Sequence, residues 1–367
     1  MPEHVLGISA FYHDSAASLV TDGEVVAAAA EERFNRQKHY SDFPEQAAEY
    51  CLDEAGITVD DLDYVAFYEK PFLKFERILR TYFSTFPKSR QTFVKTMPEW
   101  LTKKIYIKNV LKRELGYDGE VLFPEHHQSH AASTFLASPF DEAAVMTVDA
   151  TGEKATTALG EGEGNQFDLV KEVEFPHSLG LLYSTFTSHL GFYVNSGEGK
   201  VMGMASYGDP VYYDKIMEDV IDVKQDGGFK LNMDYFAYHY SEQMYSDKFL
   251  DEFGEPRDPE RDDFDDRHAN LAASIQKVTE EILLTMADHL HEETGQDNLC
   301  LAGGVVLNCV ANGRIKREGP FDNIYIQGAA GDDGGAMGAA LYASNTLLAH
   351  DRQDMDNLYW GPSYTNE

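Results

Sequence analysis

Three of the thirteen histidines of this 367-residue chain lie within five residues of one another, at a spacing that suits metal binding. They fall in the segment EHHQSHAAS, residues 125–133, where His126 and His130 are four positions apart. On a helix this spacing puts both rings on one face, and two neutral imidazoles placed so can chelate one divalent cation. A polar helix start without a ligand is the alternative explanation for these histidines.

Two aspartates could complete such a site. Asp149 follows the apolar run 145–148 and precedes a small-residue turn, a position from which acids of open α/β sheets face the cleft. Asp332 stands in a glycine-rich stretch before a predicted helix, where capping of that helix is its alternative role. Two histidines and two aspartates favour Fe(II), Mn(II) or Zn(II) with open positions, whereas closed structural zinc sites use thiolates more often.

Other groups could serve acid–base chemistry and phosphate binding. His13 lies in the turn after the first predicted strand, where it could act as a general base with Asp14 as its orienting carboxylate. Glycine-rich turns let backbone amides approach a phosphate closely, and a nearby lysine adds a cation. The candidates for nucleotide binding are Gly152, Gly303, Gly304, Asn308 and Lys200. No Walker A or dinucleotide fingerprint is present, and each turn is also explained as a tight turn alone.

The elements that must position these groups follow a plan that occurs twice. Strands are predicted at 5–9, 16–21 and 25–30, with an Asp22-Gly23 turn, and again at 143–149, 156–159 and 169–173. Helices and further strands alternate after each set, which indicates an α/β protein. Two hairpin-led α/β lobes suggest the actin, sugar-kinase and heat-shock-ATPase superfamily, in which a nucleotide lies between the lobes.

Charge is distributed unevenly along the chain. Asp and Glu number 63 against 30 Lys and Arg, and the net charge of −33 argues against a nucleic-acid-binding protein. Residues 70–113 are the opposite, with twelve basic, two acidic and eight aromatic residues. This segment is predicted to be helical, with breaks near Pro87 and Pro98.

The remaining composition disfavours further classes. The sequence contains no run of about 18 apolar residues, so a membrane span is not expected. Its N-terminus lacks the basic start and apolar core of a signal peptide. The three cysteines form neither a disulfide framework nor a CxxC pair, so we expect a cytoplasmic protein. A metallopeptidase is disfavoured because the paired histidines do not belong to an HExxH motif.

Seven motifs, in order along nearly the whole chain, resemble the N-terminal domain of the NodU/CmcH-type O-carbamoyltransferases, a family of nodulation-factor and antibiotic biosynthesis. They are HDSAAS (13–18), EERFNRQKH (31–39), EHHQSHAAS (125–133), TVDATGE (147–153), SGEGKVMGMASYG (196–208), LAGGVVLN (301–308) and GAAGDDGGAMGAA (328–340).

The resemblance implies a threonylcarbamoyl-transferase-like domain, two-lobed and α/β, with a helical insert. It implies transfer of a carbamoyl group from carbamoyl-adenylate, made from carbamoyl phosphate and ATP, to a hydroxyl of a sugar-like or other small molecule. Fe(II) is the favoured cation, and the implied ligands are His126, His130, Asp149 and Asp332. The implied nucleotide contacts are Gly303, Gly304 and Asn308, and His13 would lie near the acceptor.

The resemblance also implies domain limits and partners. Residues 1–350 would form the transferase domain, with lobes at about 1–141 and 142–350 and a basic helical insert at about 70–116. Residues 351–367 would begin a linker toward an activating domain outside this chain. The expected partners are that adenylate-forming domain, or a separate one, and a small-molecule acceptor, and a homodimer stays open. So do two alternatives: a tRNA-modifying threonylcarbamoyl transferase, and a non-catalytic nucleotide-binding subunit that needs a partner.

Overall fold

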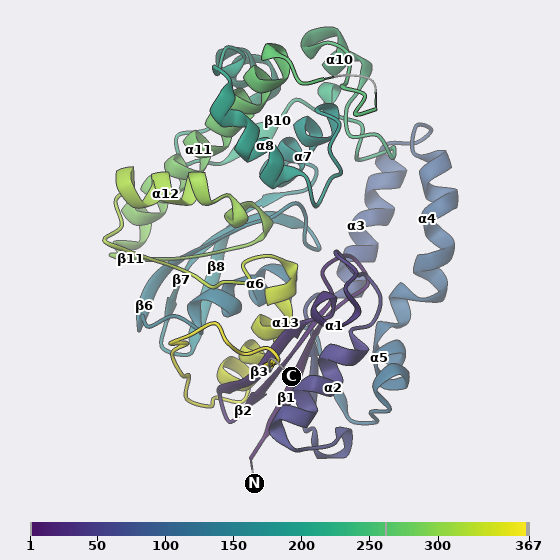
Figure 1. The fold of residues 1–367 in the computed structure, drawn as a ribbon, viewed down its shortest axis with the longest axis vertical. Coiled ribbons are helices and arrows are strands. Elements are labelled where there is room, and N and C mark those ends of the chain that lie inside the picture. Colours follow the sequence, from purple (N-terminus) through teal and green to yellow (C-terminus); the bar gives the residue numbers. More distant parts are fainter. Residues whose placement is uncertain (1, 261–262, 365–367) are drawn as a thin grey trace.

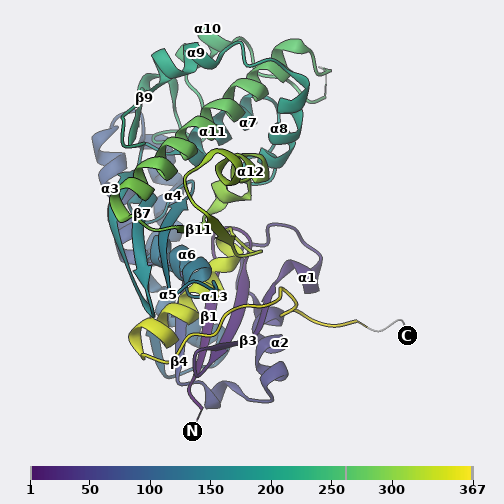
Figure 2. The same cartoon turned by 90° about the vertical axis from the view of Figure 1, so that its left-hand side faces the viewer.

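The computed structural model describes residues 2–260 and 263–364, and two five-stranded mixed sheets organise it (Figure 1, Figure 2). In the first sheet, β1 pairs antiparallel with β2 and parallel with β4, so a hairpin continues as a parallel sheet of order β3-β2-β1-β4-β5. Its strands are β1 (His4–Ser9), β2 (Ala16–Thr21), β3 (Glu24–Ala30), β4 (Tyr64–Phe67) and β5 (Glu120–Leu122).

The second sheet repeats this plan with the order β8-β7-β6-β11-β12. Here β6 pairs antiparallel with β7 and parallel with β11. Its strands are β6 (Glu142–Val148), β7 (Ala155–Glu163), β8 (Gln166–Glu174), β11 (Asn298–Ala302) and β12 (Asn323–Ile326). The predicted two-lobed α/β fold class is confirmed, and the strand plan expected twice is present twice.

The turn between β2 and β3 shows how the sequence sets the first hairpin. Asp22 and Gly23 both have positive φ, +49° and +92°. This is the left-handed backbone of the tight turns that match the twist of antiparallel strands, and aspartate and glycine adopt it most readily. The Asp-Gly pair therefore closes the hairpin where the sequence predicts it.

Two helices lie between the sheets, α6 (His126–Phe135) and α13 (Asp332–Leu341). α6 packs against β6 and β11 of the second sheet, α13 packs against β1 and β2 of the first, and the two helices contact each other (Figure 1). Close approach depends on glycine: a Cβ on Gly338 would lie 1.8 Å from the carbonyl oxygen of Ser129. Met337 and Leu341 of α13 accordingly belong to the apolar core of the first sheet.

Further helices pack against strands of both sheets. α2 packs on β2 and β3, and α11 packs on β6 and β7. A small two-stranded sheet pairs β9 (Ile221–Val223) with β10 (Phe229–Leu231). The helices are α1 (Glu32–Asn35), α2 (Glu45–Ala55), α7 (Leu179–His189), α8 (Glu198–Met204), α9 (Tyr213–Lys215), α10 (Asp247–Phe253), α11 (Asp266–Thr294) and α12 (Cys309–Glu318).

The basic aromatic segment forms three helices along one side of the molecule, and the middle one reaches the second lobe, where the Thr92 hydroxyl donates to Tyr240 O (Figure 1). They are α3 (Pro71–Ser84), α4 (Arg90–Thr102) and α5 (Ile107–Leu115). The break near Pro87 is confirmed, but the break predicted near Pro98 is wrong, because Pro98 lies inside α4. Met97 and Trp100 are buried on either side of it, so packing holds the helix together despite the lost backbone hydrogen bond. None of the helices in the described part of the chain combines the length and apolar composition that a membrane crossing requires.

The segment after residue 350 has no helix or strand where it is described, up to residue 364. It runs along the first sheet, where the carbonyl oxygen of Trp360 accepts hydrogen bonds from the backbone N–H of Ala28 and the hydroxyl of Tyr50. Residues 365–367 of the expected linker lie outside the described residues. The lobe limits at 141 and 142 stay predictions.

Candidate functional site

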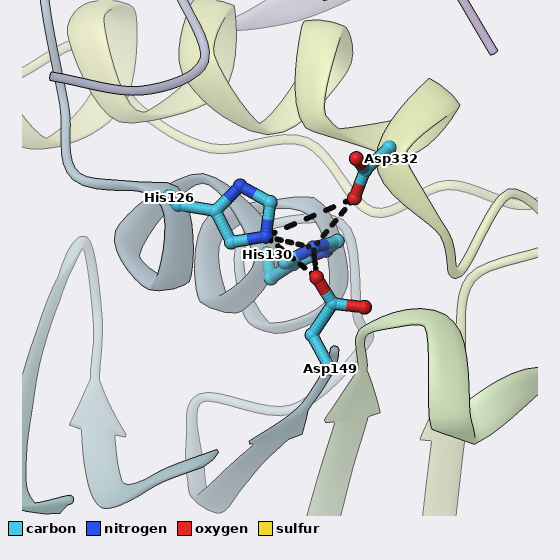
Figure 3. Close-up of side chains that lie close together, drawn as sticks. All are labelled: His126, His130, Asp149 and Asp332. Carbon is cyan, nitrogen blue, oxygen red and sulfur yellow. Dashed lines mark hydrogen bonds and ion pairs between the residues drawn. The ribbon is translucent and has the colours of Figure 1, made fainter. Parts of the chain in front are cut away.

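The four side chains expected to bind a metal converge on one point (Figure 3). One ligand atom from each of His126, His130, Asp149 and Asp332 lies within 4.8 Å of all the others. The two Nε2 atoms are 3.1 Å apart, and the Nε2 of His126 lies 2.8 Å from Asp149 Oδ2. The Nε2 of His130 lies 3.4 Å from Asp332 Oδ1.

Three elements deliver these ligands. The first two turns of α6 carry the histidines, and the Glu125 side chain accepts a hydrogen bond from the N–H of Gln128, so the helix begins at His126. Asp149 directly follows β6, where the backbone N–H of Gly304 donates to its Oδ1 at 3.0 Å. Asp332 is the first residue of α13 and makes no capping bond, which leaves its carboxylate free to face His130.

Burial and charge both suit a cation at this point. All four side chains are buried. Burial opposes ionisation of Asp149, but the hydrogen bond with His126 and the ion pair with His130 hold the pKa of its carboxyl well below the usual range. Burial likewise opposes a charged His130, yet Asp149 and Asp332 raise its pKa to about 9.

The two histidines and two aspartates have the chemistry that a divalent transition metal needs. Two imidazole nitrogens face each other and two buried carboxylates. The negative charges of Asp149 and Asp332 therefore lie at the point where all four side chains present a ligand atom. Two nitrogen and two carboxylate ligands with room for others suit Fe(II), Mn(II) or Zn(II). His127, between the two ligands, is different, because its ring lies against Thr147 Oγ1 at 2.7 Å and Ala155 O at 3.1 Å. Burial lowers the pKa of His127 to about 3, so this ring stays neutral and holds α6 against β6 and β7.

His13 and Asp14 stand beside the four ligands. The Nδ1 of His13 lies 2.8 Å from Asp14 Oδ2, and its Nε2 lies 3.6 Å from Asp332 Oδ2. The other oxygen of Asp14 lies 2.9 Å from His39 Nδ1. Burial opposes the charged form of His13, but the carboxylates of Asp14 and Asp332 outweigh it and raise its pKa to about 9. Asp14 thus orients His13 so that Nε2 faces Asp332.

A cavity of about 450 Å³ adjoins this cluster. Asp149, Asp332 and His13 line one part of it, and Gly304 and Asn308 line another. Its volume falls in the range of about 300–1,000 Å³ usual for sites that hold nucleotide-sized ligands. The cavity is therefore large enough for a ligand that contacts both Asp332 and the glycine turn after β11.

Arg33, Lys38 and His39 also line this cavity, and the sequence did not single out the two cations, Arg33 and Lys38. All three belong to the EERFNRQKH motif, which supports the family resemblance without indicating a role for its single residues. Clustering of basic residues in one matched motif of an acidic chain was the signal that could have identified them. The charges of Arg33 and Lys38 suit phosphate oxygens.

The glycine turns have different relations to the cavity. Gly303 has φ +101°, and a Cβ there would lie 2.3 Å from Val148 O, so glycine is needed to bring this turn against β6. The Asn308 side chain caps α12 by accepting from the N–H of Ala311, and it donates to Gln276 Oε1 at 2.8 Å. Its amide is thus already engaged, although it lines the cavity.

Gly152 and Lys200 lie outside the lining of this cavity. A Cβ on Gly152 would lie 3.1 Å from both His126 and His127, so this glycine lets the turn after β6 pack on α6. Lys200 is exposed, with its ammonium 5.7 Å from the centre of the Phe192 ring. Its neighbours on α8, Gly199 and Met202, line the cavity in its place.

Comparison with known proteins yields a family and several relatives. The family model for the carbamoyltransferase N-terminus matches residues 4–341. The chain is 53% identical over 377 residues to an uncharacterized protein of Synechocystis sp., covering 99% of this chain and 61% of that one. It is 35% identical to nodulation protein NolNO of Sinorhizobium fredii, covering 96% and 49% of the two chains. It is 24% identical to the 3'-hydroxymethylcephem-O-carbamoyltransferase of Amycolatopsis lactamdurans, covering 70% and 47%. The chain thus spans between about half and three fifths of these relatives' lengths.

Proposed function

This chain belongs to the carbamoyltransferase family, and on that premise we propose that it transfers a carbamoyl group from carbamoyl-adenylate to a hydroxyl of a sugar-like or other small molecule. The observation that carries the proposal is the cavity that joins the four-residue metal cluster and His13 to the glycine turn after β11. The printed name of the Amycolatopsis relative, an O-carbamoyltransferase, supports transfer to oxygen.

His126, His130, Asp149 and Asp332 would hold the cation, with Fe(II) favoured and Mn(II) or Zn(II) as alternatives. When bound there, a divalent cation supplies Lewis acidity toward phosphate oxygens and neutralises charge on the departing AMP. Arg33 and Lys38 would add positive charge for the same phosphate, since they line the cavity. Gly303 and Gly304 would let the chain approach the nucleotide closely, and Asn308 would hold the start of α12 beside it.

His13 would act as the general base. Asp14 fixes Nδ1, so Nε2 faces the space beside Asp332, where it would accept the proton of the acceptor hydroxyl as the hydroxyl oxygen attacks the carbamoyl carbon. This role needs a neutral imidazole, whereas the carboxylates of Asp14 and Asp332 now raise the pKa of His13. A ligand that neutralises the charge of Asp332 would lower the pKa of His13 and so favour its neutral form.

The supply of carbamoyl-adenylate belongs to a partner in this proposal. The chain covers 61% of the Synechocystis relative and 49% of the nodulation protein, so those proteins hold further sequence that can form a separate domain. An adenylate-forming domain, joined after residue 350 or supplied separately, would convert carbamoyl phosphate and ATP to carbamoyl-adenylate. We propose the cytoplasm as the site of this reaction, because the three cysteines form no disulfide.

The test combines metal analysis with product detection. The chain is incubated with carbamoyl phosphate, ATP, Fe(II) and a panel of alcohols, with and without an adenylate-forming domain, and mass spectrometry detects carbamoylated products. His126→Gln should lose both bound metal and transfer, whereas His289→Gln, on the outer helix α11, should lose neither. Metal content and transfer that both survive in His126→Gln would show the metal role to be wrong. Transfer to tRNA rather than to any alcohol would instead support the RNA-modifying alternative.

A further inference from the structure

A second, smaller cavity lies on the side of the cluster next to the basic helices. Its volume is about 180 Å³, and it is separate from the larger cavity. Lys74 and Arg77 of α3, Trp100 of α4 and Lys104 of the turn after α4 line it together with Tyr12 from the loop after β1. The basic aromatic segment therefore encloses a defined space against the body of the protein.

Positive charge in this cavity exceeds negative charge. Lys74 forms an ion pair with Glu69, and both side chains are at most 10% exposed. Lys104 lies 3.3 Å from Glu99, whose side chain is 56% exposed and is not part of the lining. Lys74, Arg77 and Lys104 thus face the cavity, while Glu69 is the acid that lines it.

Arg77 is the unbalanced cation. Within residues 2–260 and 263–364 its side chain has no hydrogen bond or ion pair, and its Nε is buried without a partner. Its guanidinium lies 4.6 Å from the centre of the Phe175 ring, a contact that leaves the edge of the guanidinium available. Arg77 is partly exposed, but its Nε is buried without an acceptor, which is costly, and a planar two-oxygen anion is the best complement of a guanidinium.

The cavity also has aromatic walls and a link to the cluster. Trp100 is 4% exposed and stacks on Phe75 with ring centres 5.8 Å apart. The ring of Tyr12 lies 4.4 Å from that of His13, so Tyr12 separates this cavity from His13 in the larger one. Thr151, two residues after Asp149, lines the same cavity. A ligand held here would lie on the other side of the Tyr12 ring from the proposed general base.

We propose that this cavity binds an oxyanion carried by the hydroxyl-bearing acceptor, with Arg77 as its main contact and Trp100 and Tyr12 as walls. The inference rests on the proposed function and names its acceptor class: a carboxylated, phosphorylated or sulfated small molecule. The volume is below the range of about 300–1,000 Å³ for whole drug-sized ligands, so the cavity suits one charged group and part of a ring.

Trp100 makes the test direct. The chain has two tryptophans, so Trp360→Phe leaves Trp100 as the one reporter, and it lies in the cavity wall. This protein is titrated with glucose, glucuronate, glucose 6-phosphate and glucose 6-sulfate, with AMP present so that the larger cavity is occupied. We expect the three charged sugars, or a subset that identifies the preferred oxyanion, to change the Trp100 fluorescence, and glucose to leave it unchanged.

Variants of α3 decide whether Arg77 is responsible. Arg77→Gln should weaken binding of the charged sugar at least about tenfold, the usual effect of losing a charge-assisted hydrogen bond. Arg77→Lys should retain part of the affinity, because it keeps the charge without the planar fork. Arg80→Gln is the matched control, since Arg80 is 76% exposed and pairs with Glu76, and it should bind as the parent does.

Two results would overturn the inference: equal binding of glucose and its charged derivatives, or unchanged affinity in Arg77→Gln. Circular dichroism and AMP binding are measured on every variant, so that loss of fold is not mistaken for loss of the site. Failure of the proposed function is separable. It would appear as absent metal and absent transfer in a chain that still binds the charged sugar through Arg77.

Discussion

Gly338 is the point at which packing and the metal cluster are most closely connected. It lies in α13, and a Cβ there would lie 1.8 Å from the carbonyl oxygen of Ser129. Ser129 precedes the ligand His130 in α6, and Asp332 begins the helix that carries Gly338. Gly338→Ala therefore pushes apart the two helices that carry three of the four proposed metal ligands.

The size of the effect follows from this distance. The obstacle is backbone, so no side-chain rotation relieves it, and the helices must separate by roughly 1.6 Å to restore ordinary contact. Overpacking of this kind costs about 1–3 kcal/mol, and we expect the upper end, about 3 kcal/mol, because both helices are buried. Metal ligands tolerate displacements of only about 0.2 Å, so metal affinity should fall at least about tenfold.

Urea unfolding and metal titration measure the two effects. With a slope of about 3 kcal/mol per molar urea, the unfolding midpoint should fall by about 1 M. Gly203→Ala in α8 is the matched control, because a Cβ there would meet nothing within 4 Å. That change should raise stability by about 1 kcal/mol through helix propensity, and leave metal affinity as it is.

The reasoning would be refuted if Gly338→Ala kept the parental midpoint and the parental metal affinity. A lower midpoint with unchanged metal affinity would show that the helix contact supports the fold without positioning Asp332.

Three further predictions concern metal, pH and thiols. A divalent cation at about 100 times its dissociation constant should raise the free energy of unfolding by about 2.7 kcal/mol in the parent and not in Asp332→Asn, and an equal rise in both would contradict the site. Burial lowers the pKa of His189 to about 4 from its ordinary 6.5, so the unfolded chain binds the proton more tightly. The free energy of unfolding therefore decreases as the pH is lowered below about 6.5. Between pH 7 and 5 this residue should remove about 2 kcal/mol, and urea unfolding of His189→Gln should show a flatter pH dependence; an identical dependence would contradict it. Iodoacetamide should modify exposed Cys309 alone in the folded chain, because burial raises the pKa of Cys51 and of Cys300 to about 12; intact mass should show one adduct, and three in urea.

The hairpin-led sheets could be predicted because their signals are local. The Asp22-Gly23 turn and the alternation of strands with helices each depend on neighbouring residues. The packing of α13 on the first sheet could not, because its small residues meet strands more than 300 positions away. The passage of α4 through Pro98 depends likewise on burial of Trp100, which outweighs the local preference of proline.

The same division holds at the cluster. The pair His126 and His130 follows from helical spacing, and Asp149 from its place after a strand. The sequence left open whether Asp332 caps α13 or joins the cluster. The tertiary packing of α13 decides this, because Asp332 makes no capping bond. The engaged amide of Asn308 could not be foreseen, because its partner Gln276 lies on a helix 32 residues earlier. Nor could the lone guanidinium of Arg77, since its surroundings come from three separate parts of the chain.

The placement of α13 has a consequence for dividing the chain. A fragment that stops at residue 141 would contain the whole first sheet but not the helix that covers β1 and β2, where a Cβ on Gly7 would lie 1.9 Å from Ala336 O. The complementary fragment would carry α13 with its apolar side unburied. Each half therefore holds a piece that the other needs, and reassembly of the two fragments would depend on α13 crossing between them, much as a strand exchanged between subunits joins a dimer.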